Sequence, residues 1–140
     1  DAVFVADKNK AQLVKDLVNK LKQSNRVEPL KHRILYRPWG SHELLIDAPG
    51  FQVRWVRVKP GCEMNLQRHM KRSEHWVVVS GFANALCGDK KMVLQESESI
   101  FIPKGELHQL GNASDSSDSW LEVIEVQVGE SLGEHDIERV

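Results

Sequence analysis

The sequence lacks the features that mark membrane, disulfide-rich and nucleic-acid-binding proteins. No apolar run approaches the ~18 residues of a membrane-spanning helix, and no basic segment followed by an apolar one suggests a signal peptide. The two cysteines form no CxxC pair, so we expect no disulfide scaffold and a cytoplasmic location. Lys and Arg total 19 and Asp and Glu total 20, without the basic excess of a nucleic-acid-binding protein.

The length and composition fit one globular domain. The 140 residues are enough for a domain with a substantial core and too few for two ordinary ones. Hydrophobic residues make up 41% and charged residues 28% of the chain, which is typical of a folded protein rather than a disordered one. The chain begins at Asp1 and not at Met, so we expect it to be part of a longer polypeptide.

The first 30 residues have a pattern of their own. Residues 2–6 are apolar with β-branched and aromatic members, which predicts a strand. Asp7 fits the N-cap of a following helix of about 16 residues. Apolar side chains then recur at helical spacing, namely Leu13, Val14, Leu17, Val18 and Leu21. Residues 25–38 contain two prolines and predict a linker.

From Trp39 onward the pattern changes to short β segments. Turns rich in Gly, Pro, Asn and Asp separate them, and no helical pattern intervenes. The predicted strands are residues 43–47, 52–58, 75–80, 83–87, 91–94, 99–102 and 121–128. Many short strands at this spacing predict an all-β sandwich or barrel.

Four polar residues in this β region could form a metal site. Gln67 and His69 are two apart, so in an extended segment they point to the same side. Glu74 follows after a predicted turn, and His108 lies far along the chain. Imidazole nitrogens with amide and carboxylate oxygens suit Zn, Mn, Fe, Co or Ni. Taken singly, each histidine could equally be an ordinary core or surface residue.

The spacing of these residues resembles the two motifs of the cupin superfamily. The first, G-x5-H-x-H-x3,4-E-x6-G, is matched by Gly61, Gln67 in place of the first His, His69, Glu74 and Gly81. The second, G-x5-P-x-G-x2-H-x3-N, is matched by Pro103, Gly105, His108 and Asn112, with Ser97 where Gly is expected. The resemblance implies a double-stranded β-helix, or jelly-roll barrel, with a metal in its mouth. The implied ligands are Gln67, His69, Glu74 and His108.

Further segments narrow the resemblance. They include RPWG at 37–40, VKPG at 58–61, LQRH at 66–69, RSEHW at 72–76, VVSG at 78–81 and IEVQ at 124–127. Together they resemble the C-terminal isomerase domain of the bifunctional mannose-1-phosphate guanylyltransferase/mannose-6-phosphate isomerases. Residues 1–30 resemble the end of that family's nucleotidyltransferase domain. We therefore expect a boundary between residues 1–30 and an isomerase domain over residues 31–140.

This resemblance implies a reaction and its cofactor. An isomerase of this type interconverts mannose 6-phosphate and fructose 6-phosphate, with a divalent metal ion (Zn, Co, Mn, Ni or Mg) as Lewis acid. The Gly-rich nucleotide-binding loop of the transferase is absent from these residues. The chain by itself is therefore not expected to make GDP-mannose, the product expected of the longer polypeptide.

Two cationic residues are candidates for the substrate's charged groups. Arg72 lies within the family-like segment, and a guanidinium can bind a phosphate or a developing oxyanion through two hydrogen bonds. A salt bridge at the rim of the barrel is the alternative for Arg72. Lys104, in a turn beside Pro103, is a second phosphate candidate, and a solvated turn lysine is its alternative.

The acid–base group is expected among the acidic residues of the last long strand. Alternation over residues 121–128 places Glu125 and Glu122 on opposite faces of the strand. Glu125 could face the cavity, and Glu122 is expected to face solvent. Because His75 adjoins Glu74, it should point away from the ligands. Glu134 and Asp136 are further acid–base candidates without a placed role.

Three functions remain open on the sequence alone, since one fold hosts many activities. The first is a metal-dependent isomerase. The second is a non-catalytic cupin that binds sugar or mediates dimerisation, and the third is an oxidative cupin with iron. For partners we expect a sugar phosphate and a homodimer, because jelly-roll domains have spare β edges. Neither nucleic acid nor a membrane is expected.

Overall fold

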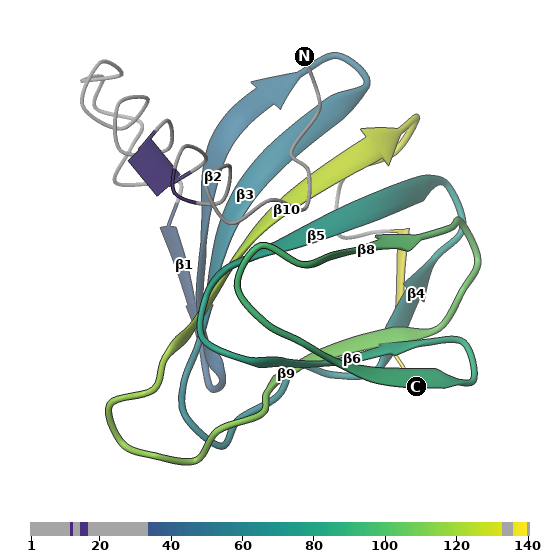
Figure 1. Cartoon of the computed structure of the whole chain (residues 1–140). Helices are drawn as coiled ribbons and strands as arrows, with labels where there is room; N and C mark the ends of the chain where they lie inside the picture. Colours follow the sequence, from purple (N-terminus) through teal and green to yellow (C-terminus); the bar gives the residue numbers. More distant parts are fainter. Residues whose placement is uncertain (1–11, 13–14, 17–33, 133–135, 140) are drawn as a thin grey trace.

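The computed structural model describes residues 12, 15–16, 34–132 and 136–139, and most of these lie in two antiparallel β-sheets (Figure 1). The predicted strand at residues 2–6 lies outside the described residues. Of the predicted helix only residues 12 and 15–16 are described, and they are helical. Among the described residues, no helix has the length and apolar character needed to cross a membrane.

Eleven strands make up the described fold. They are β1 (Ile34–Arg37), β2 (Gly40–Ala48), β3 (Phe51–Val58), β4 (Gln67–His69), β5 (Arg72–Ser80), β6 (Ala83–Cys87), β7 (Lys90–Leu94), β8 (Ser99–Ile102), β9 (His108–Asn112), β10 (Leu121–Gly129) and β11 (Ile137–Arg139). The larger sheet has the order β1-β2-β3-β10-β5-β8, and the smaller has the order β11-β4-β9-β6-β7. The prediction of an all-β barrel is confirmed.

All seven predicted strands are present, and four further strands were not predicted. Residues 34–37, which we expected in a linker, instead form β1 and pair with β2 across the turn at Pro38 and Trp39. β4 and β11 have only three residues each, too few to show alternation. β9 contains Gly111 and Asn112, which predicted a turn. Gly111 is needed there because a Cβ would lie 2.9 Å from Glu63 Cβ.

Both faces of the larger sheet carry apolar side chains. Successive residues of a strand point to opposite faces, so the apolar residues of one strand divide between two clusters. The main core lies between the sheets and includes Val56, Val58, Val78, Leu121 and Val123, together with Ala85, Ile102 and Leu110 from neighbouring strands. A second, smaller cluster consists of Leu45, Val79 and Ile124.

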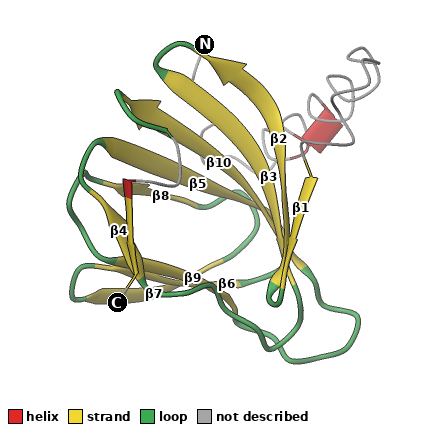
Figure 2. Cartoon of the chain, turned by 180° about the vertical axis from the view of Figure 1, so that it is seen from behind, coloured by secondary structure: helices red, strands yellow, loops and turns green. Residues whose placement is uncertain are grey.

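Strand register brings the polar residues together. β10 is central in the larger sheet, where Glu125 lies opposite Arg54 of β3 and Gln127 lies opposite Glu74 of β5. In the smaller sheet, Gln67 of β4 lies opposite His108 of β9. Both views of the molecule place β1 and β4 on opposite sides of the barrel (Figures 1 and 2). The two sheets therefore contribute different parts of one site.

Ser97 occupies a backbone conformation that favours glycine. It is the single non-glycine residue with positive φ among the described residues, at 79°. It stands where the cupin motif expects Gly. The left-handed conformation is unfavourable for residues with a Cβ, so the departure from the motif leaves a locally strained turn.

Candidate metal centre

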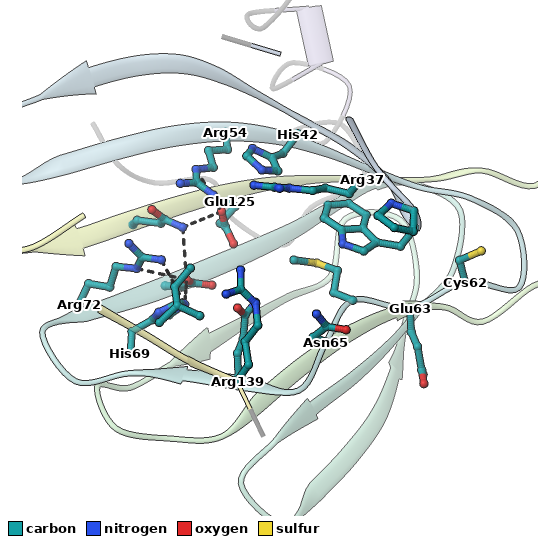
Figure 3. A pocket seen from close by; sticks show the side chains of 17 residues that line it. Arg37, His42, Arg54, Cys62, Glu63, Asn65, His69, Arg72, Glu125 and Arg139 are labelled. Atoms are coloured by element: carbon teal, nitrogen blue, oxygen red, sulfur yellow. Dashed lines mark hydrogen bonds and ion pairs between the residues drawn. The ribbon is translucent and has the colours of Figure 1, made fainter. Parts of the chain in front are cut away.

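A cavity of about 510 Å³ opens inside the barrel and is lined by both sheets (Figure 3). Most of its ionisable lining is arginine and glutamate: Arg37, Arg54, Arg72, Arg139, Glu63, Glu74 and Glu125. The buried part of the wall also includes His69 and Gln127. Such a concentration of polar and charged groups inside a barrel is expected for a functional site rather than a core.

Three ligand-type side chains converge beside this cavity: His69 and Glu74 line it, and His108 lies next to Glu74 without being part of the lining. One ligand atom from each of His69, Glu74 and His108 lies within 4.8 Å of the others. His69 Nε2 is 3.0 Å from Glu74 Oε2, and His108 Nε2 is 3.9 Å from Glu74 Oε1. All three side chains are buried. Two imidazoles and a carboxylate in this arrangement match the donor set of a divalent transition metal.

The hydrogen bonding of His108 fits metal binding. Its Nδ1 lies 3.0 Å from the carbonyl oxygen of Glu106, and because a carbonyl only accepts, Nδ1 carries the proton. Nε2 then holds a lone pair, and it has no hydrogen-bond partner among the described residues. Burial lowers the pKa of His108, against the opposing charge of Glu74. The neutral imidazole is therefore oriented as metal-ligating histidines commonly are.

Glu74 is held ionised by its surroundings. Burial acts to raise the pKa of Glu74, but the hydrogen bond with His69 and the nearby His108 outweigh it and bring the pKa well below its usual range. Trp76 Nε1 donates to Oε1 at 2.9 Å, and Gln127 Nε2 donates to Oε2 at 3.3 Å. Arg72 Nε lies 3.8 Å from Oε2. This carboxylate is thus both fixed in position and charged.

Glu125 is the opposite case, a carboxyl group held protonated. Burial, followed by the charge of Glu74, raises the pKa of Glu125 to about 8. Its Oε1 accepts a hydrogen bond of 2.9 Å from Gln127 Nε2 and lies 3.9 Å from Arg54 Nε. The amide of Gln127 therefore links the two carboxyl groups (Figure 3). Neighbouring carboxyls with pKa values pushed apart are typical of acid–base sites.

The structure places most, but not all, of the predicted site residues at the cavity. Gln67 lines it two residues from His69, and Glu125 faces it as the alternation suggested. Arg72 is 2% exposed and lies beside the ligands, with Nη2 3.3 Å from His69 Nε2, so it forms no rim salt bridge. Lys104 is exposed and is not part of the lining. The structure therefore does not bring Lys104 to this site.

Other candidates have roles outside the cavity. His75 is exposed and its ring lies 4.8 Å from that of Phe101. Glu122 is not in solvent as expected but half-buried, because it accepts a 3.0 Å hydrogen bond from Trp55 Nε1. Asp136 accepts hydrogen bonds from the backbone amides of residues 70 and 71. Glu134 lies outside the described residues.

Sequence reasoning missed four residues of the site. Gln127 shares a face with Glu125, so the alternation offered a signal for it. No sequence pattern pointed to Arg54, because its place in the site follows from the pairing of β3 with β10, which sets Arg54 opposite Glu125. Arg37 and Arg139 belong to β1 and β11, strands that the sequence did not predict.

Comparison with known proteins identifies the family of the chain. Residues 24–140 match the family described as mannose-6-phosphate isomerase C-terminal. The alginate biosynthesis protein AlgA of Pseudomonas aeruginosa is 44% identical over 140 residues, which cover 100% of this chain and 28% of AlgA. A mannose-1-phosphate guanylyltransferase of Klebsiella pneumoniae is 41% identical, over 100% of this chain and 29% of that protein. The chain thus spans less than a third of these relatives.

Solved structures show the same fold. A sugar phosphate isomerase of the cupin superfamily from Silicibacter pomeroyi superposes with a TM-score of 0.56 at 22% identity, covering 63% of this chain and 58% of that one. A cupin-2 domain protein from Rhodospirillum rubrum has a TM-score of 0.61 at 20% identity, covering 71% and 64%. At these identities the likeness concerns the fold alone, which is the double-stranded β-helix expected from the motifs.

Proposed function

The chain belongs to the family of mannose-6-phosphate isomerase C-terminal domains, and we propose that it interconverts mannose 6-phosphate and fructose 6-phosphate with a bound divalent metal ion. The convergence of His69, Glu74 and His108 within 4.8 Å beside the cavity carries this proposal. A non-catalytic sugar-binding module would have little use for such a cluster next to a second buried carboxyl group.

The residues present fit a metal of the Zn, Co, Mn, Ni or Mg group. His69, Glu74 and His108 supply two nitrogens and a carboxylate, and Gln67 can add its amide oxygen from the same wall. When bound, the ion would supply Lewis-acid polarisation of the sugar's carbonyl and hydroxyl oxygens. The remaining chemistry belongs to the chain's own side chains.

The reaction moves a proton between C2 and C1 of the open-chain sugar, and Glu125 is the proposed group for it. Its carboxyl is 5% exposed, faces the cavity and lies beside the ligand group. Gln127 holds it in place through a 2.9 Å hydrogen bond. A positioned acid–base group typically contributes ~10²–10⁴-fold to rate. The ionised form of Glu125 would accept the proton from one carbon, and the resulting carboxylic acid would return it to the other.

Arg72 is proposed to position the ligands and to stabilise charge. Its guanidinium contacts both Glu74 and His69, and a fixed cation beside the reacting end of the sugar favours the enediolate over the neutral sugar. The Arg72 guanidinium would stabilise this charge without first having to move, because the surrounding strands bury the side chain and fix its position. Arg72 therefore belongs to the reacting end of the cavity.

A coupled assay on metal-stripped protein tests the proposal. We expect no conversion of mannose 6-phosphate without metal, and recovery when Zn, Co, Mn, Ni or Mg is returned singly. His69→Ala should abolish both metal binding and turnover, whereas the matched variant His75→Ala, at the exposed histidine, should retain both. Equal rates with and without metal would overturn the Lewis-acid role. Metal binding without turnover in any ion would favour a sugar-binding module.

The relatives suggest the wider context of the chain. Since AlgA and the guanylyltransferase are more than three times as long, we propose that this chain is the isomerase part of a longer polypeptide of GDP-mannose biosynthesis. Residues 1–30 would then belong to the end of a nucleotidyltransferase domain. A homodimer and a cytoplasmic location remain predictions, which size-exclusion chromatography and cell fractionation of the longer protein would check.

A further inference from the structure

The cavity carries an excess of positive charge. Four arginines line it, against three glutamates. Of these glutamates, Glu74 belongs to the ligand group, and Glu63 points away from the cavity (Figure 3). Glu63 lies instead over Gly111, where a Cβ would be 2.9 Å from its own Cβ. An interior of this kind attracts an anionic ligand beyond what the metal group alone would bind.

The arginines fall into two pairs. Arg72 and Arg54 lie beside the buried carboxyl groups, at 3.8 Å from Glu74 and 3.9 Å from Glu125. Arg37 and Arg139 line the same cavity from two other strands, β1 and β11. The first pair therefore contacts the buried carboxyl groups, and the second pair reaches the cavity from two edge strands.

Arg37 and Arg139 come from the edges of different sheets. Arg37 ends β1, one edge strand of the larger sheet, and Arg139 ends β11, one edge strand of the smaller sheet. The two side chains reach into the cavity from opposite sides (Figure 3). Neither is near the other in sequence.

The alternation along β11 turns Arg139 toward the cavity. Arg139 lies in register with Gln67 on β4. The intervening residue, Glu138, points outward and pairs with Arg68 at 2.9 Å. Asp136 at the start of the segment accepts the amide hydrogens of residues 70 and 71. The alternation along the strand then places residues 137 and 139 on the cavity side.

We propose that Arg37 and Arg139 together form the clamp for the substrate's phosphate group. This inference rests on the proposed function, in which C1 and C2 of the sugar must lie at the metal group. The phosphate on C6 is at the other end of the same molecule, so cations touching the metal ligands are too close to hold it. Two guanidinium groups from opposite walls can bind a phosphate through paired, charge-assisted hydrogen bonds.

The clamp makes the last strand a determinant of substrate specificity. A sugar without phosphate would lose its contacts with Arg37 and Arg139 but keep those at the metal group. We therefore expect the preference for phosphorylated over neutral sugars to depend on these two residues, and not on Arg72 or Lys104.

Calorimetric titration of the full metal-loaded chain with inorganic phosphate tests the clamp directly. Arg37→Gln and Arg139→Gln should each weaken phosphate binding by about tenfold or more, as expected for the loss of a charge-assisted hydrogen bond. In the isomerase assay both should raise KM for mannose 6-phosphate by a similar factor and change kcat by less than about threefold. Arg139→Lys should bind phosphate more tightly than Arg139→Gln, since lysine keeps the positive charge but lacks the paired N–H donors of the guanidinium.

Two matched variants serve as controls. Arg57→Gln removes an exposed arginine of β3 that stacks on Trp120, with Cζ 4.9 Å from the ring centroid. Glu138→Gln removes the outward salt bridge of β11 while keeping Arg139. Both should leave phosphate affinity within about twofold, since exposed ion pairs contribute little.

The outcomes separate the clamp from the isomerase function. Phosphate affinity unchanged in the Arg37→Gln/Arg139→Gln double variant, or no phosphate binding by the unaltered chain, would overturn the clamp even if isomerisation is intact. A kcat loss with unchanged KM would also overturn it. Phosphate binding that needs both arginines, in a chain without isomerase activity, would support the clamp and refute the proposed reaction.

Discussion

The interior of the barrel has two ends, built by the same strands but opposite in chemistry. Along β10, Leu121 and Val123 pack in the apolar core, whereas Glu125 and Gln127 line the cavity. β5 runs antiparallel beside it and shows the same division between its two ends. Alternation decides which face a side chain takes, and position along the strand decides whether that face meets core or site.

The two ends also differ in how they contribute to stability. Burying the apolar end is favourable at about 25 cal/mol per Å² of apolar surface. At the polar end, His69 Nδ1, His108 Nε2 and Gln127 Oε1 are buried without a hydrogen-bond partner among the described residues. Unsatisfied buried groups are unfavourable and are concentrated at functional sites. The apolar end therefore stabilises the fold in which the polar end performs chemistry.

The largest expected effect is that of removing the central charge of the polar end. Glu74→Gln should abolish metal binding and lower turnover by about 10³-fold or more, because a Lewis acid contributes several kcal/mol to the transition state. Metal content by elemental analysis and the coupled assay would measure both. Glu122→Gln, which removes a carboxylate from the outer face of β10, is the control and should retain both properties.

Glu125→Gln should separate proton transfer from metal binding. We expect turnover to fall ~10²–10⁴-fold while metal is retained, because the ligands are unchanged. A variant that lost its metal in parallel would instead place Glu125 among the groups needed to hold the ion.

The same variant has an expected pH signature in the metal-free chain. The folded-state pKa of Glu125, about 8, lies above its ordinary value of 4.5 because of burial and Glu74. The folded state thus binds this proton more tightly than the unfolded state. Its stabilising contribution is complete below pH ~4.5 and is lost as the pH rises through ~8. Denaturant titrations at several pH values should show this decline, and Glu125→Gln should flatten it.

A truncation in the apolar core should lower the free energy of unfolding and leave metal binding and turnover unchanged, in contrast to a substitution in the site. Val123→Ala removes two buried methyl groups, so we expect the free energy of unfolding to fall by about 2 kcal/mol. Metal content and kcat of the folded fraction should stay unchanged. If kcat fell as much as stability, the two ends would not be independent.

The smallest expected effect concerns Ser97, which lies outside the cavity lining. Ser97→Gly should relieve the positive-φ strain, worth about 1–2 kcal/mol, against a loss of chain entropy of about 0.5–1 kcal/mol. Chemical denaturation should therefore show a gain of about 0.5 kcal/mol. Ser99→Gly, within β8, is the comparison and should be destabilising, because that position is a regular strand.

Prediction from the sequence succeeded where the information is local. Period-two alternation located seven strands and the cavity-facing side of β10. It failed for β1, β4, β9 and β11. β4 and β11 have only three residues each, β1 directly precedes Pro38, and β9 contains Gly111 and Asn112. Composition therefore did not favour these strands, which depend on the hydrogen bonds of their neighbours. The spacing around Gln67, His69 and Glu74 identified a possible ligand set, but not its surroundings.

The amino-acid sequence by itself determined the strand pattern, the fold class and the residue types able to hold a metal. The closure of the two sheets decided the rest: Arg54 beside Glu125, Gln127 between two carboxyl groups, and Arg37 and Arg139 facing one cavity. Register and sheet pairing join residues far apart in the chain, and those long-range pairings also set each carboxyl group's burial and charge neighbours. That is why Glu74 and Glu125, alike in sequence, differ in protonation.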